Sequence, residues 1–129
     1  MLKTFFIDYD VSIREQLESI ILSYSGCTEY LLSHEEFNSK GEHKPHFHFY
    51  LKCDNIKTFN NIVKNVKENW NLIELGKQIR KDTGKTGYRN YGVIKKEVYD
   101  EEYFKQYISK DKNVWGSYPP EQIQAYIDA

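Results

Sequence analysis

Five segments of the chain have the hydrophobic pattern of β-strands, because apolar and polar residues alternate or because β-branched and aromatic residues cluster. They predict strands over residues 4–9, 28–34, 45–53, 72–80 and 88–98. Apolar residues at helical spacing predict helices from Ser12 to Gly26, from Asp54 or Thr58 to residue 70, and from about residue 100 to 110. The resulting order, βαββαββα, predicts an α+β fold with a central antiparallel sheet of about five strands and flanking helices, packed mainly on one face.

The segments between these elements are polar or rich in turn-forming residues. Residues 35–44 predict a loop, and residues 82–87 (DTGKTG) predict the turn of a hairpin between the last two strands. Pro119 and Pro120 precede a short helical stretch, which we expect to lie at the periphery of the fold.

The strand predicted over residues 45–53 (PHFHFYLKC) has a strict period of two. Its first set of side chains is apolar and is expected to face the core: Phe47, Phe49, Leu51 and Cys53. Its second set lies on the opposite face: His46, His48, Tyr50 and Lys52. Two imidazoles two residues apart on one face of a strand can bind a single cation. The same pattern also fits two half-exposed histidines with no ligand.

The size and composition of the chain predict one domain, over residues 1–129, with a real hydrophobic core. Cys27 and Cys53 form neither a disulfide framework nor a CxxC zinc motif, which favours a reducing, intracellular compartment. No apolar run is long enough for a membrane helix, and the N-terminus has no signal-peptide pattern. We therefore expect neither membrane insertion nor secretion.

The net charge of -1 conceals an uneven distribution of charged residues. Residues 1–36 contain seven acidic and two basic side chains, whereas residues 77–96 contain seven basic side chains and one acidic one. A basic segment of this kind can bind a polyanion, although a solvated hairpin with scattered lysines has the same composition. The candidate DNA-binding residues in and around the predicted basic hairpin are Lys77, Arg80, Lys81, Lys85, Arg89 and Tyr91.

The last predicted helix has a polar stripe whose side chains could take part in a reaction. Tyr103, Tyr107 and Lys110 follow at i, i+4 and i+7, while Phe104 and Ile108 form a separate stripe suited to the core. A tyrosine with a pKa of about 10 is a poor nucleophile in neutral water. A neighbouring ammonium group and a metal-bound phosphate would both make it a better one. Together with the two histidines, these residues favour attack on a phosphodiester.

Two short motifs in combination resemble the HUH endonucleases. Residues 45–49 (PHFHF) resemble the His-hydrophobe-His motif of that superfamily, and residues 107–111 (YISKD) are similar to the tyrosine motif of rolling-circle replication initiators from circular single-stranded DNA viruses. The stretch over residues 103–116, which includes Trp115 and Gly116, is most similar to the geminivirus and circovirus branch. The resemblance extends over nearly the whole chain.

The resemblance implies an HUH domain of ferredoxin-like topology that nicks and rejoins single-stranded DNA at a replication-origin stem-loop. It implies that His46 and His48 bind Mn²⁺ or Mg²⁺, that Tyr107 forms a 5′-phosphotyrosine link, and that Lys110 lies near the scissile phosphate. Such initiators work in the host nucleus or cytoplasm, together with host replication proteins or with a downstream helicase domain. We expect no helicase domain within this chain.

Two assignments within the expected site stay open at this point. Enzymes of this type usually add a carboxylate ligand from the strand before the histidines, for which Glu36 is the best match and Glu35 the next. Tyr103 precedes Tyr107 by four residues and therefore resembles the second tyrosine of phage-type initiators. We expect Tyr107 to act alone, because Lys110 follows it as in the single-tyrosine viral motif.

Two other functions are compatible with the sequence. An aromatic-rich α+β domain can bind single-stranded nucleic acid by stacking without any catalysis. A relaxase or transposase would use the same tyrosine chemistry on a different DNA target.

Overall fold

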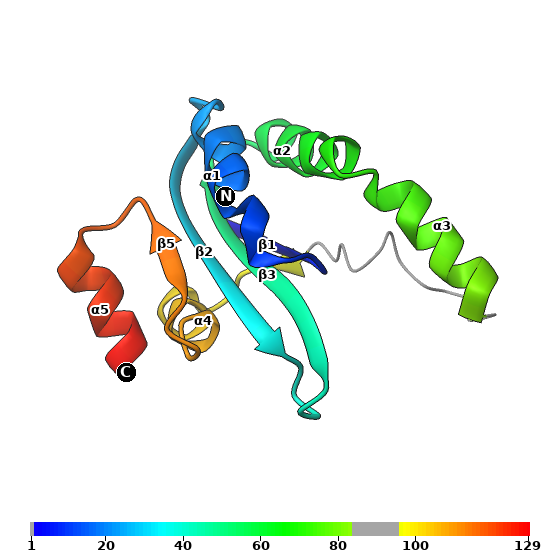
Figure 1. Ribbon diagram of the computed structural model, residues 1–129. Coiled ribbons are helices and arrows are strands. Elements are labelled where there is room, and N and C mark those ends of the chain that lie inside the picture. Colours follow the sequence, from blue (N-terminus) through cyan, green and yellow to red (C-terminus); the bar gives the residue numbers. More distant parts are fainter. Residues whose placement is uncertain (1, 84–95) are drawn as a thin grey trace.

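The computed structural model describes residues 2–83 and 96–129, which form a sheet with helices on both faces (Figure 1). Within these ranges the sheet has five strands in the order β4-β1-β3-β2-β5, and every neighbouring pair is antiparallel. The predicted α+β class and strand number are therefore confirmed. The elements in chain order are β1 (Leu2–Ile7), η1 (Val11–Ile13), α1 (Arg14–Leu22), β2 (Cys27–Phe37), β3 (His43–Cys53), α2 (Ile56–Asn69), α3 (Leu72–Thr83), β4 (Lys96–Glu97), α4 (Glu101–Ile108), β5 (Val114–Gly116) and α5 (Pro120–Asp128).

The β2–β3 hairpin is longer than its sequence indicates. Residues 35–37 and 43–44, predicted as loop, continue the two strands, and Phe37 pairs with His43. Asn38 closes the short connection, because its side-chain oxygen accepts hydrogen bonds from the backbone N–H groups of Lys40 and Glu42, each at 3.0 Å. Gly41 takes the positive φ of 77° that the turn requires. Glu35 is buried, whereas the other residues of this segment that extend the two strands are exposed or half-exposed.

One face of the sheet carries the larger core. The alternating residues Phe47, Phe49, Leu51 and Cys53 all point into it, as predicted. Phe5 of β1 stacks on Phe49 with ring centroids 4.0 Å apart. The short helix η1 and helices α1 and α2 cover this face with apolar residues: Ile13 from η1, Leu17 and Ile21 from α1, and Phe59, Ile62, Val63 and Val66 from α2.

The opposite face is partly covered by the C-terminal third of the chain. Leu31 of β2 and Tyr50 of β3 pack there against Ile108 of α4, against Tyr118, which precedes α5, and against Tyr126 of α5. In Figure 1, α4 and α5 lie on one side of the β2–β3 ribbon and α2 and α3 on the other. The expectation of helices mainly on one face and of a peripheral C-terminal tail is therefore wrong. The reason is that β5, which was not predicted, pairs with β2 and brings the tail onto the sheet.

The segment from residue 72 to residue 80, predicted as a strand, belongs to helix α3. Leu72, Leu75 and Ile79 recur at helical spacing, and the intervening Glu, Lys, Gln and Arg residues favour helix. Leu72 is buried in the larger core, against which α3 begins. The prediction of a strand as the first arm of a basic hairpin is therefore wrong. The second arm appears as β4, whose two residues pair with β1, while residues 84–95 lie outside the described part of the chain.

Among the described residues, no helix combines the length and apolar character needed to span a membrane.

A buried lysine joins α4 to the sheet and to α5. Lys105 is only 2% exposed, and its ammonium group lies 5.4, 4.8 and 5.0 Å from the ring centroids of Tyr50, Tyr118 and Tyr126. The carboxylates of Glu101 and Glu102, in the first turn of α4, lie 3.1 and 3.2 Å from the same nitrogen. Burial raises the pKa of Tyr118 to about 12, so that its ring remains a neutral phenol. Cation–π and ionic contacts together offset the desolvation of the ammonium group.

We predict that Lys105→Met lowers the free energy of unfolding by about 1–3 kcal/mol, because it removes a desolvated cation from three aromatic rings. Urea denaturation followed by circular dichroism measures this difference. Lys64→Met is the matched control, because Lys64 lies exposed on α2 and its ammonium group is 4.0 Å from a carboxylate oxygen of Glu68, which is itself exposed. We expect the control to change stability by less than about 0.5 kcal/mol. Equal losses in the two variants would contradict this role for Lys105.

Candidate metal centre and active site

The candidate site lies on the α4 face of the sheet, beyond the part that α4 and α5 cover. His46, His48 and Tyr50 share this face of β3, because side chains of a strand alternate between faces. Tyr50 is buried under α4, whereas the two histidines line a cavity. On the neighbouring strand β2, Glu35 pairs directly with His46 and therefore points to the same side.

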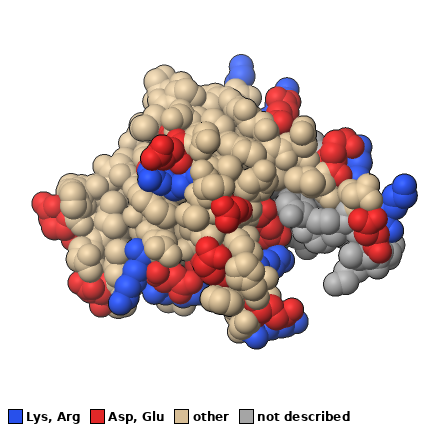
Figure 2. Space-filling view, in the orientation of Figure 1, with Lys and Arg blue, Asp and Glu red and all other residues tan. Residues whose placement is uncertain are grey.

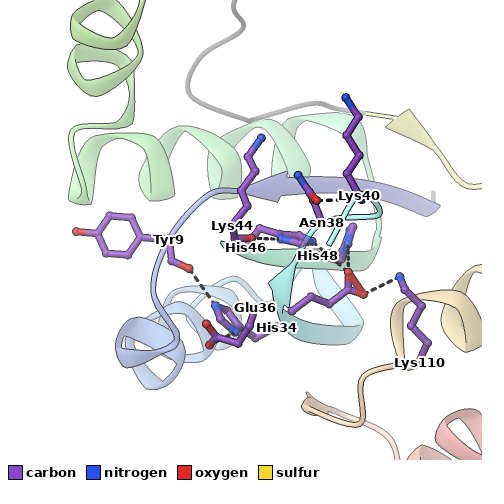
Figure 3. A network of polar contacts seen from close by, with 10 residues as sticks. Tyr9, His34, Glu36, Asn38, Lys40, Lys44, His46, His48 and Lys110 are labelled. Atoms are coloured by element: carbon purple, nitrogen blue, oxygen red, sulfur yellow. Dashed lines mark hydrogen bonds and ion pairs between the residues drawn. The ribbon is translucent and has the colours of Figure 1, made fainter. Parts of the chain in front are cut away.

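Glu35, His46 and His48 converge on one point. One oxygen of Glu35, Oε1, lies 3.1 Å from Nε2 of His46 and 3.3 Å from Nε2 of His48. One potential ligand atom from each of the three residues lies within 4.8 Å of the others. Nδ1 of His46 donates a hydrogen bond to the carbonyl oxygen of Lys44 at 2.6 Å, which orients the ring with Nε2 toward Glu35 (Figure 3). This arrangement of two imidazoles and a carboxylate could hold a divalent cation.

The carboxylate of Glu35 is buried and surrounded by positive or hydrogen-bonding partners. Its second oxygen, Oε2, lies 2.7 Å from the ammonium nitrogen of Lys110, which approaches from the segment after α4. Burial by itself raises the pKa of Glu35, but hydrogen bonds from His46, His48 and Lys110 outweigh it and hold the pKa far below its ordinary value. The hydrogen bond to Glu35 in turn raises the pKa of His46. Glu35 is therefore an anion at neutral pH, as a metal ligand must be.

The structure reverses the preference between the two candidate carboxylates. Glu36 points to the opposite side of β2, because it is the next residue along the strand. Its carboxylate lies 3.6 Å from Nδ1 of His34 and 3.0 Å from Nε2 of His43, away from the His46–His48 pair. His34 is held in place by a second contact, between its Nε2 and the carbonyl oxygen of Tyr9 at 3.0 Å (Figure 3). Of the two carboxylates, Glu35 is therefore the one that lies beside His46 and His48 and could complete a metal site.

Tyr107 lies beside the candidate metal centre. Its ring centroid is 6.5 Å from that of His48 in an edge-on arrangement, and Nζ of Lys110 lies 4.0 Å from the centroid of the tyrosine ring. The side chain is about half exposed, at 48%. Tyr107 and Lys110 line the same cavity, of about 370 Å³, as Glu35, His46 and His48. The two residues of the predicted tyrosine motif and the two predicted histidines are therefore brought together.

Tyr103 is on the same side of α4 but outside this cavity. Its ring is nearly parallel to that of Tyr107, with an interplanar angle of 23° and centroids 6.4 Å apart. Tyr107 lines both the cavity at the metal ligands and a neighbouring groove, whereas Tyr103 lines only the groove. Of the two tyrosines, Tyr107 is the one adjacent to the metal ligands.

Of the predicted DNA-binding residues, Lys77 and Lys81 have described side chains, and neither lines the cavity. Lys77, Arg80 and Lys81 belong to α3. Lys77 is exposed and pairs with Glu74 at 3.4 Å. The remaining three, Lys85, Arg89 and Tyr91, lie outside the described residues. On the face drawn in Figure 2, basic and acidic side chains intermingle and form no single basic patch.

Three charged residues of the cavity were not among the predicted site residues: Asp8, Lys44 and Asp111, the last residue of the tyrosine motif. The ammonium group of Lys44 lies 3.6 Å from Oδ2 of Asp8. Lys44 immediately precedes the histidine motif, which is a signal that sequence analysis could have used. Asp8 follows β1, and only the pairing of β1 with β3 brings it beside the histidines.

Comparison of this chain with models of known protein families, with curated proteins and with solved structures finds no match in any of the three. The candidate site therefore rests on its own geometry.

Proposed function

We propose that this chain is a metal-dependent endonuclease and strand transferase that cleaves single-stranded DNA through a 5′-phosphotyrosine intermediate. One observation carries the proposal: the phenol of Tyr107 and the cluster of Glu35, His46 and His48 line the same cavity. Lys110 links the two parts, because its ammonium group contacts both Glu35 and the ring of Tyr107. A nucleophile, a cation and a potential metal centre around one cavity are the components that attack on a phosphodiester requires.

The residues divide the chemistry between them. Glu35, His46 and His48 would hold Mn²⁺ or Mg²⁺, and their nitrogen ligands favour Mn²⁺ over Mg²⁺ in vitro. The bound cation supplies Lewis-acid polarisation of a non-bridging phosphate oxygen. Lys110 lies beside the ring of Tyr107, where its positive charge would stabilise the negative charge that develops at the reacting oxygens in the transition state. Lys44 and Lys110 add positive charge to the wall of the cavity in which the phosphate would bind.

The covalent step conserves the energy of the phosphodiester. The Oη atom of Tyr107 forms a bond to phosphorus as the bond from phosphorus to the 3′-oxygen breaks. The phenol loses one proton and the departing 3′-oxygen gains one. A free 3′-hydroxyl can attack the phosphotyrosine and reverse the step, so strands can be rejoined without ATP.

This reaction suits the start of rolling-circle replication. The nick exposes a 3′-hydroxyl for DNA synthesis while the enzyme stays on the 5′ end, and the later strand transfer closes the circle. The substrate we propose is single-stranded DNA of a viral replication-origin stem-loop, with a helicase domain or host replication proteins as partners in the cell. Support for this step comes from the similarity of residues 45–49 and 107–111 to the motifs of viral initiators.

We predict that the protein forms a covalent adduct with single-stranded DNA in the presence of Mn²⁺ and that Tyr107→Phe abolishes it, because phenylalanine has no oxygen nucleophile. A fluorescent random-sequence oligonucleotide, denaturing gel electrophoresis and mass spectrometry of the peptide containing residue 107 provide the measurement.

Tyr103→Phe is the matched control, because it removes a hydroxyl from the same helix without removing one from the metal cavity. We expect this variant to retain adduct formation within about twofold, a free-energy difference of well under 1 kcal/mol. DNA binding without an adduct, over a pool that contains all short sequences, would identify the chain as a non-catalytic binding module. An adduct on a transposon end or conjugation origin, but not on a stem-loop origin, would favour the transposase or relaxase alternative.

We predict that Glu35→Gln weakens the binding of Mn²⁺ at least about tenfold, because it replaces the anionic ligand with a neutral amide. Isothermal titration calorimetry with Mn²⁺ alone measures the dissociation constant. Glu36→Gln is the control, since this neighbouring carboxylate contacts His34 and His43 instead. Equal affinities of Glu35→Gln and the unmodified protein, with unchanged thermal unfolding, would rule out Glu35 as a ligand.

A further inference from the structure

A second hollow adjoins the candidate active site and shares one wall with it. This groove, of about 350 Å³, is lined by Tyr99, Tyr103 and Tyr107 together with Val98 and Phe104. Tyr107 also lines the cavity that contains the metal ligands. A molecule whose reacting atom lies at the phenol oxygen of Tyr107 therefore has the groove directly beside it.

The aromatic side chains of the groove are unusually open to solvent. Tyr99 is 93% exposed and Tyr103 is 65% exposed, although both have large rings that normally bury most of their area. The neighbouring rings of Tyr103 and Tyr107 are nearly parallel. Exposed aromatic rings gathered at one place indicate a binding surface, and flat rings favour flat ligands.

Charge separates the two hollows. The cavity is lined by the basic residues Lys44 and Lys110 and by the two histidines, together with the carboxylates Asp8, Glu35 and Asp111. Its lysines and histidines can contact a phosphate, whereas the described lining of the groove has no basic side chain. Among the described residues that line the groove, the one with a charged side chain is Asp100. Its Oδ1 accepts a hydrogen bond from the backbone N–H of Tyr103 at 3.0 Å. This carboxylate disfavours a phosphate in the groove but not a neutral base. The pair of hollows thus matches the two parts of a nucleotide.

We propose that the groove is a nucleobase subsite, in which a base next to the attacked phosphodiester stacks on Tyr99 and Tyr103. The proposal rests on the proposed function, because it takes single-stranded DNA as the ligand of the neighbouring cavity. It gives Tyr103 a binding role through its ring instead of a role as a second nucleophile through its hydroxyl. Stacking of this kind accepts every base, since each has a π-face, and so contributes affinity more than sequence preference.

Binding of oligonucleotides in EDTA separates stacking from cleavage. The probes are fluorescent oligo(dT) and a strand of the same length and charge in which every nucleotide is abasic, and anisotropy measures both dissociation constants. We expect the unmodified protein to prefer oligo(dT) at least about fivefold, the lower end of what stacking of one base provides. The double variant Tyr99→Ala and Tyr103→Ala is expected to lose most of this preference.

The double variant Tyr99→Phe and Tyr103→Phe is the matched control, because it keeps both rings and removes both hydroxyl groups. We expect it to retain the preference for oligo(dT). Tyr99→Ala alone is a further test if the double alanine variant unfolds, since Tyr99 is almost fully exposed. An unchanged preference in this single variant and in a folded double alanine variant would overturn the proposal.

The adduct assay distinguishes failure of this inference from failure of the proposed function. If alanine variants with unchanged oligo(dT) preference still form the Mn²⁺-dependent adduct, the subsite is wrong and the enzyme stands. If the unmodified protein binds oligo(dT) through these rings but forms no adduct, the proposed subsite is supported and the proposed endonuclease activity is contradicted. A loss of preference in the phenylalanine variant as well would show recognition through the hydroxyl groups, which also contradicts stacking.

Discussion

The candidate site depends on the buried carboxylate of Glu35. An ionised carboxylate removed from water is stable only when partners replace its hydration, and three groups do so here. His46 and His48 approach one oxygen from β3, and Lys110 approaches the other from the chain after α4. This single charge therefore connects the central hairpin to the segment that follows the tyrosine helix. It also explains why two histidines and a lysine can share so small a volume.

The sheet is divided on one face between a packed part and an open part. Tyr50 lies at the division: it is buried beneath α4, while His48, two residues before it on β3, lines the open cavity. Lys105 fixes α4 at this level through its contacts with Tyr50 and with Tyr126 of α5. The position of Tyr107 at the mouth of the cavity follows from that anchor, because it lies two residues further along the same rigid helix.

Predictions from the sequence succeeded where one local period dominated. The alternation over residues 45–53 correctly predicted which side chains of β3 face the core, and the helical stripe around Tyr107 correctly separated the core positions from the exposed ones. They failed where two periods competed. Residues 72–80 have apolar positions that fit a helix, but the turn-forming residues 82–87 that follow favoured a hairpin and therefore a strand. The polarity of residues 35–44 hid the continuation of two strands, because most of these side chains are exposed and the buried one, Glu35, is polar and held by charged or hydrogen-bonding partners.

The sequence by itself determined the ingredients of the site: two histidines on one face of a strand, and a tyrosine on the polar side of a helix with a lysine three residues after it. These are local properties, set by the two-residue period of a strand and the 3.6-residue period of a helix. The tertiary structure alone decided that Glu35 and not Glu36 completes the cluster, because that choice depends on the register between β2 and β3. It also decided that Asp8, β5 and α5 lie beside these elements, since strand order in a sheet is a long-range property.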